Sequence, residues 1–116
     1  MSAAATKVNR HDIRKVIFDN YNDTDTRFSN DDILEHLNHD DRYRAMNLDA
    51  LDFEDVLMEL EKARLLRVIA QNFNTRYYRL WAVMEPATCK ACGQASYFAP
   101  TEEEKVCPSC GAKMQQ

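Results

Sequence analysis

Residues 56–80 read VLMELEKARLLRVIAQNFNTRYYRL, and the hydrophobic period changes part-way along this stretch. In its first part, apolar residues recur every three to four positions, which is the spacing of one face of an α-helix. The residues of that face are Val56, Leu57, Leu60 and Ala63. The pattern predicts a helix that begins at about Asp49 or Asp52 and ends at Arg64, with these four side chains buried.

The second part of the stretch is rich in β-branched and aromatic residues, which favour strands. It predicts one strand over residues 65–70, a turn over residues 71–75 and a returning strand over residues 76–83. The aromatic side chains of the returning strand are expected to pack against the helices. These side chains are Tyr77, Tyr78 and Trp81.

Two more helices are predicted before this stretch, each from a capping signal followed by an apolar stripe. Asn9 begins the first with Asp12 as its capping partner, and Ser29 begins the second with Asp32 in the same relative position. The apolar stripes are Ile13, Val16, Ile17 and Tyr21 in the first helix and Ile33, Leu34 and Leu37 in the second. Residues 39–47 are polar and predict an irregular connection to the third helix.

Three helices followed by a two-stranded hairpin is the order of a winged helix-turn-helix domain, which is an α+β fold. The chain resembles that family over residues 9–83, most closely at residues 28–34 (FSNDDIL), 56–66 (VLMELEKARLL) and 76–80 (RYYRL). The resemblance implies that the hairpin is the wing and that the third helix takes the place of the recognition helix.

Four cysteines near the C-terminus form two matched pairs, in residues 89–93 (CKACG) and residues 107–111 (CPSCG). A Cys-x2-Cys turn brings two thiolates within reach of one tetrahedral metal ion, and two such turns supply four ligands. The glycine after each second cysteine suits a turn that needs a positive φ. Two disulfides or four free thiols are the alternatives. The predicted metal ligands are Cys89, Cys92, Cys107 and Cys110.

Residues 89–116 resemble a zinc ribbon, and the second cysteine pair also resembles that of rubredoxin, which binds iron. The ribbon resemblance implies short strands at residues 97–99 and 105–106, joined by a hairpin tip. Zinc (Zn²⁺) is favoured because the loop between the pairs is shorter than in rubredoxins and because Tyr97 and Phe98 are all that remains of the aromatic shield. A zinc ion with four sulfur ligands has no open position, so we expect a structural role and no enzymatic activity.

The rest of the ribbon is expected to be surface. Its tip contains three successive glutamates, residues 102–104, which predict a solvated turn. Any contact made by the ribbon is expected to use side chains around the metal site, namely Lys90, Tyr97, Phe98 and Lys113. All glycines and prolines lie at residue 86 or later, which marks a boundary. The predicted organisation is a flexible tail (residues 1–8), a winged-helix domain (9–84), a linker (85–88) and a zinc ribbon (89–116).

The 116 residues carry a net charge of −4, which counts against strong non-specific binding to nucleic acid. No apolar run is long enough to span a membrane, and the N-terminus lacks the apolar stretch of a signal peptide. Because the cysteines are spaced for metal rather than for disulfides, a reducing, cytoplasmic location is expected. No small-molecule substrate is evident from the sequence.

Two groups of charged residues are candidates for contacts with partners. The outward face of the third helix is acidic and would repel phosphates, so it is predicted to be either a solvated surface or a protein contact. Its residues are Asp52, Asp55 and Glu59. Basic residues around the wing are predicted either to aid solubility while their stems cover the wing aromatics, or to contact nucleic acid. They are Arg64, Arg67, Arg76 and Arg79. The acidic third helix and the basic first helix would also complement each other across a homodimer.

The complete layout, a winged helix followed by a short linker and a ribbon, resembles a family of small archaeal predicted transcriptional regulators. It also resembles the alpha subunit of general transcription factor E, although this chain lacks the long helical linker expected there. Both resemblances imply DNA or the transcription machinery as the partner. Two alternatives stay open: a module that contacts only protein through its acidic third helix, and a rubredoxin-like iron electron carrier.

Overall fold

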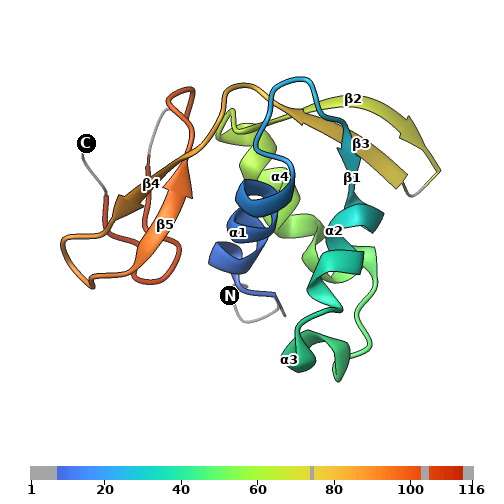
Figure 1. The fold of residues 1–116 in the computed structure, drawn as a ribbon, viewed down its shortest axis with the longest axis horizontal. Coiled ribbons are helices and arrows are strands. Elements are labelled where there is room, and N and C mark those ends of the chain that lie inside the picture. Colours follow the sequence, from blue (N-terminus) through green and yellow to red (C-terminus); the bar gives the residue numbers. More distant parts are fainter. Residues whose placement is uncertain (1–7, 74, 103–104, 114–116) are drawn as a thin grey trace.

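The computed structural model of this chain describes residues 8–73, 75–102 and 105–113. It is an α+β structure of helices and antiparallel sheets, as predicted (Figure 1). The elements are α1 (Arg10–Asn20), β1 (Phe28–Ser29), α2 (Asn30–Leu37), α3 (Asp41–Arg44), the 3-10 helix η2 (Ala50–Phe53), α4 (Glu54–Lys62), β2 (Leu66–Asn72), β3 (Thr75–Leu80), β4 (Glu85–Thr88) and β5 (Ala95–Phe98). No helix in the described ranges is long and apolar enough to cross a membrane. Most of the predicted tail lies outside these ranges, but Val8 is buried in the core.

The helices α1 and α2 begin at the predicted capping residues. The Asn9 side chain accepts a hydrogen bond from the His11 amide at 2.7 Å. Ser29 and Asp32 form a reciprocal capping box, in which the Asp32 amide donates to Ser29 Oγ at 3.1 Å and the Ser29 amide donates to the Asp32 carboxylate at 2.9 Å. These bonds satisfy amides that the first turn of a helix leaves without partners.

Two short helices lie where the sequence predicts an irregular connection and the start of the third helix. In α3 the hydroxyl of the buried Tyr43 donates to Asp12, so Asp12 anchors α3 instead of capping α1. Further on, Asp49 and Asp52 form a capping box that begins η2, and α4 starts only after it. Phe53 ends η2 and is fully buried, so the change from the 3-10 helix to α4 occurs where this ring enters the core.

The strands β1, β2 and β3 form an antiparallel sheet in the order β1-β3-β2. The pairing of β2 with β3 confirms the predicted hairpin, although β3 ends at Leu80 and leaves Trp81 beyond the strand. A bulge interrupts the register of β2 between Val68 and Ala70. The sequence predicts no strand at β1, whose two residues pair with the middle of β3 and occupy its second edge.

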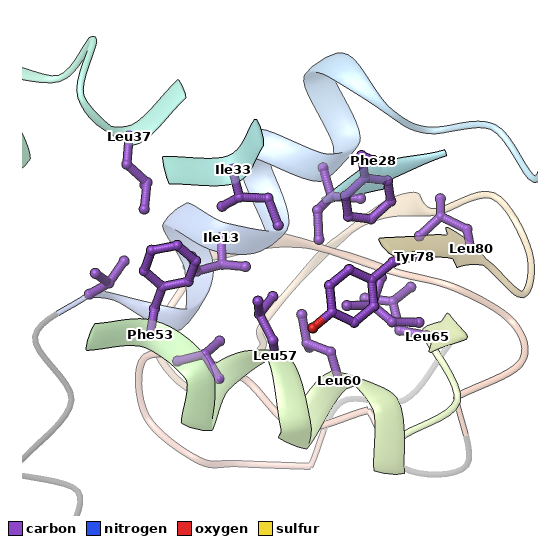
Figure 2. Packing of buried hydrophobic residues seen from close by; sticks show 14 of the residues in the cluster. Ile13, Phe28, Ile33, Leu37, Phe53, Leu57, Leu60, Leu65, Tyr78 and Leu80 are labelled. Atoms are coloured by element: carbon purple, nitrogen blue, oxygen red, sulfur yellow. The ribbon is translucent and has the colours of Figure 1, made fainter. Parts of the chain in front are cut away.

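One side of this sheet faces the helices, and side chains from α1, α2, α4 and β3 meet there in one core (Figure 2). Ile13, Ile33 and Leu57 are among its fully buried members. Tyr78 is 1% exposed, as expected for an aromatic residue that packs against the helices. Trp81 is 48% exposed and therefore does not share this role.

The strands β4 and β5 form a second antiparallel sheet, in which Pro86 lies opposite Tyr97. The predicted linker, Glu85–Thr88, is therefore a strand, because all four of its residues pair with residues of β5. The strand predicted at residues 105–106 does not pair with β5. Val106 instead forms an isolated bridge with Lys113, and these two residues flank the second cysteine turn.

The predicted ribbon, which includes β5 and both cysteine turns, packs directly on α1. The rings of Phe18 and Tyr97 stack with their centroids 4.1 Å apart. Glu102, which was expected to be solvated, is 3% exposed and forms an ion pair with Arg14 of α1. The other two glutamates of the tip lie outside the described residues. Phe98, expected at the surface around the metal site, is fully buried. The ribbon covers one side of α1, and this packing buries residues that look like surface in the sequence.

Candidate metal centre and nucleic-acid interface

The four predicted metal ligands lie together in the structure. The Sγ atoms of Cys89, Cys92, Cys107 and Cys110 are all within 4.8 Å of one another. In two pairs, Cys89–Cys110 and Cys92–Cys107, the sulfur atoms are 3.6 Å apart. A tetrahedral ion with metal–sulfur bonds of about 2.3 Å requires sulfur atoms about 3.8 Å apart, so this arrangement fits one metal ion. All four cysteines are free, so the alternative of two disulfides is not adopted.

Two turns of the same geometry hold the cysteines in place. The Gly93 amide donates to the Cys89 carbonyl at 2.8 Å, and the Gly111 amide donates to the Cys107 carbonyl at 3.0 Å. The φ angles of the two glycines are 79° and 80°, in the left-handed region that other residues rarely adopt. A Cβ atom at either position would meet nothing within 4 Å. The backbone angle, rather than lack of space, therefore requires glycine here.

Backbone amides are directed at the first sulfur of each pair. The amide of Cys92 lowers the pKa of the Cys89 thiol. At Cys107 burial acts to raise the pKa. Hydrogen bonds from the Cys110 and Ser109 amides and with the Cys92 and Cys110 thiols together outweigh this effect, so the pKa falls to about 7. A lowered pKa favours the thiolate at neutral pH, which is the form that binds metal. At Cys92 and Cys110 the amides of Gln94 and Ala112 act to lower the pKa, but burial and hydrogen bonds with the other thiols outweigh them and raise it. The turns therefore supply the positions of all four sulfur atoms and favour the thiolate at the first cysteine of each pair.

The structure separates the four predicted wing arginines into different environments. Arg67 and Arg79 lie opposite each other on β2 and β3, and point away from the helices because their neighbours in the strands are buried. Arg76 lies on the other face, where its Nη2 atom is 3.3 Å from Glu61 Oε1. Arg64 lies in the turn after α4 with a φ of 70°. Of the four, Arg67 and Arg79 alone share the outer face of the sheet.

Arg27, which no pattern in the sequence marks as a site residue, also lies on this outer face. It immediately precedes β1, whose Phe28 pairs with Tyr78. Continuing the antiparallel register by one residue places Arg27 beside Arg79. A strand of two residues has no hydrophobic period of its own, so the sequence carries no signal that Arg27 lies beside the hairpin.

The three acidic residues predicted to contact protein have different surroundings. Asp52 accepts a hydrogen bond from the Asp49 amide and so stabilises the start of η2. Asp55 is exposed on α4. Glu59 accepts two hydrogen bonds from Arg10 of α1, at 2.9 and 2.8 Å. The charge pairing between the first helix and the acidic helix, predicted across a homodimer, is therefore formed within one chain.

Comparisons with known proteins add little to this geometry. No family model and no curated protein matches the sequence. A solved structure described as "Structure of Prokaryotic Transcription Factors" is similar at 16% sequence identity and a TM-score of 0.39, covering 76% of this chain and 67% of that one. A likeness at this level does not show a shared function.

Proposed function

We propose that this chain is a transcription-associated regulator or adaptor that combines a winged-helix domain with a four-cysteine zinc ribbon. The observation that supports the proposal most strongly is the pairing of β1 with β3, which gives the sheet order β1-β3-β2. A helix, a short strand, further helices and a hairpin that pairs back onto the short strand is the topology expected of a winged helix. In Figure 1 this strand lies beside the hairpin that follows α4.

The ribbon is proposed to hold one Zn²⁺ ion through Cys89, Cys92, Cys107 and Cys110. Bound there, the ion would join two turns that are 14 residues apart in the chain. Because all four positions around it would be filled by protein sulfur, it would stabilise the fold without binding a substrate. A module of this size buries too little apolar surface to be stable alone, which is the usual reason for a structural metal. We accordingly propose a non-enzymatic role.

The helix α4 is a poor candidate for reading DNA in the major groove. In DNA-binding helix-turn-helix proteins the recognition helix places its exposed residues against base edges, between two lines of phosphates. The exposed residues of α4 include Glu54, Asp55 and Glu59, which would be repelled there. In the described part of the chain, three arginines that form no ion pair with a carboxylate, Arg27, Arg67 and Arg79, lie together on the outer face of the sheet. We therefore assign nucleic-acid contact to the sheet rather than to α4.

A second candidate function is favoured by apolar side chains exposed beside these acidic groups. Leu51 of η2 is 64% exposed and Met58 of α4 is 42% exposed. Apolar groups surrounded by carboxylates suit a protein surface that is apolar at its centre and basic at its rim. In this version the chain is an adaptor that contacts a protein of the transcription machinery through η2 and α4.

Affinity purification from the source cells, with and without a nuclease that degrades DNA and RNA, tests the proposal. Recovery of RNA polymerase subunits after nuclease treatment would support the adaptor, and their recovery only without nuclease would support a nucleic-acid-bound regulator. Recovery of no transcription protein in either case would contradict a role in transcription.

A pair of matched variants locates the adaptor contact. Met58→Arg should abolish recovery of the polymerase. Met46→Arg, at a residue of equal 42% exposure outside α4, should leave it unchanged. If both variants or neither affects recovery, the contact does not lie on α4.

A further inference from the structure

The outer face of the three-stranded sheet carries a row of three arginines, one in β2, one in β3 and one immediately before β1. Arg67 and Arg79 are directly opposite each other across β2 and β3. Arg27 continues the row at the start of β1, because the next pair along the register is Phe28 with Tyr78. Phe28 and Tyr78 are both buried against the helices, and side chains alternate along a strand. The row therefore points to the side of the sheet opposite the helical core.

Aromatic rings lie between these arginines. The Arg27 guanidinium lies 5.0 Å from the centroid of the Tyr77 ring, and the Arg67 guanidinium lies 5.3 Å from that of Trp81. The indole Nε1 of Trp81 donates to the Leu66 carbonyl at 3.2 Å, which fixes the orientation of an indole that is 48% exposed. The face thus alternates cationic groups with ring surfaces held in place by the sheet.

The described part of the protein does not balance the charge of this row. Among the described residues, no ion pair joins Arg27, Arg67 or Arg79 to a carboxylate, whereas Arg10, Arg14, Arg42, Arg44 and Arg76 all have such partners. The Nε atom of Arg79 is also shielded from solvent, and it has no hydrogen-bond acceptor among the described residues. Like charges directly opposite each other across two strands destabilise a sheet. An arrangement of this kind favours a bound polyanion, which would remove the repulsion.

We infer that this face binds single-stranded nucleic acid, with phosphates on the arginine row and an unpaired base against Trp81. The inference rests on the proposed role in transcription but names a different nucleic acid from the duplex that a winged helix usually contacts. Two steps between neighbouring strands make the row about 10 Å long, enough to contact two or three successive phosphates. Rings held on the face of a sheet can reach the faces of bases, and these are accessible only where the bases are unstacked.

Fluorescence anisotropy with the zinc-loaded full chain tests the inference directly. A labelled 16-nucleotide single strand of mixed sequence and the corresponding duplex would be titrated separately at 50 and 200 mM salt. We expect the single strand to bind at least tenfold more tightly than the duplex. With three phosphates contacted, log K should fall with log salt with a slope of about −2.

Trp81 provides a second measurement, because it is the single tryptophan of the chain. A base that stacks on the indole should quench its intrinsic fluorescence when unlabelled single strand is added, and the duplex should cause much less quenching. This measurement uses the unaltered protein, so it stays decisive even if a variant folds poorly. Binding of the single strand without any change in tryptophan fluorescence would overturn the predicted placement of the base.

Charge variants identify the face. Replacing the row by Arg27→Gln, Arg67→Gln and Arg79→Gln together should weaken single-strand binding at least 30-fold, and Arg79→Gln alone by about 3- to 10-fold. The matched control is Arg42→Gln with Arg44→Gln, two exposed arginines of α3, which should change affinity less than twofold. Unfolding curves of each variant confirm that the fold is retained.

The results separate this inference from the proposed function. Equal affinity for duplex, lost in the same triple variant, would overturn the single-strand inference while leaving a nucleic-acid regulator intact. Absence of binding to either nucleic acid at 50 mM salt would overturn the inference, while recovery of polymerase after nuclease treatment would still support the adaptor. Single-strand binding that survives the triple variant would show that the sheet is not the site.

Discussion

Arg14 of α1 and Glu102 of the loop after β5 form an ion pair that is almost completely buried. Their Nη2 and Oε1 atoms are 2.7 Å apart, and the two side chains are 9% and 0% exposed. Arg14 also donates to the Tyr97 carbonyl, and Glu102 accepts the Ala99 amide, each at 2.7 Å. Each charged group thus has its ionic partner and a further hydrogen bond to the backbone. The pair can therefore join the first helix to the ribbon without leaving an isolated buried charge.

We expect Glu102→Ala to reduce the free energy of unfolding by about 3–5 kcal/mol, because it leaves the Arg14 charge buried without its partner. Urea unfolding followed by circular dichroism measures the change. The control is Asp19→Ala, which breaks the exposed pair between Lys15 and Asp19 and should cost less than about 1 kcal/mol. The double variant Arg14→Met with Glu102→Leu should recover most of the loss. Equal effects of Glu102→Ala and Asp19→Ala would show that the buried pair does not hold the ribbon.

The chain purified from its own cells should contain one zinc ion per molecule and be colourless. Cys107→Ser should lose the metal, whereas Ser109→Ala, in the same turn but not a ligand, should keep it. Elemental analysis and the visible spectrum check both expectations. A red protein with one iron per chain would instead support the rubredoxin-like electron carrier.

Removal of the metal with a chelator should also loosen α1, although none of the ligands lies there. The reason is that β5 contacts α1 through the Phe18–Tyr97 stack and through Arg14. Hydrogen exchange of the amides in residues 10–20 should become faster in the chelated protein. Unchanged exchange in α1 would mean that the ribbon stays docked without its metal.

The residue that ends α4 offers a test of backbone strain. Arg64 has a φ of 70°, its amide donates to the Glu61 carbonyl at 3.1 Å, and the Leu65 amide donates to the Leu60 carbonyl at 3.0 Å. This is the Schellman pattern, in which glycine is usual at the left-handed position. Thermal or urea unfolding should show Arg64→Gly to be more stable than Arg64→Ala by about 1 kcal/mol, and both variants equally lack the guanidinium. At Lys62, inside α4, the order should reverse, with alanine the more stable.

His11 predicts a dependence of stability on pH. Its Nδ1 atom is 3.1 Å from Ser96 Oγ, and burial between α1 and β5 lowers the pKa of its ring below the ordinary value of 6.5. Because the unfolded chain binds the proton more readily than the folded one, this contribution favours folding above about pH 6.5 and is lost as the pH falls through that value. The stability lost between pH 7.5 and pH 5.5 should therefore be smaller in His11→Gln than in the unaltered protein. His39→Gln, at an exposed position, should retain the full loss, and an equal loss in all three proteins would contradict the prediction.

Several features of the fold can be predicted from the sequence because the signals lie within a few residues of the structure they produce. The Ser29–Asp32 capping box spans four residues, and the change from helical to strand period near Arg64 fixes the start of the hairpin. The four cysteines were found for the same reason, since each turn contains its own two ligands and its own glycine. Helical structure begins at Asp49 as predicted, but two local signals, at Asp49 and at Phe53, divide the segment into the 3-10 helix η2 and the α-helix α4.

By itself, then, the sequence determined the helices, the hairpin and the cysteine turns, all of which depend on local hydrogen bonds and local spacing. The tertiary structure alone decided that residues 85–88 form a strand and that β1 pairs with β3. It also decided that Glu102 forms an ion pair with Arg14, a residue 88 positions away, and that Arg27 lies beside Arg79. A buried charge and a two-residue strand are stabilised by distant partners, so no pattern near them in the chain records where they lie.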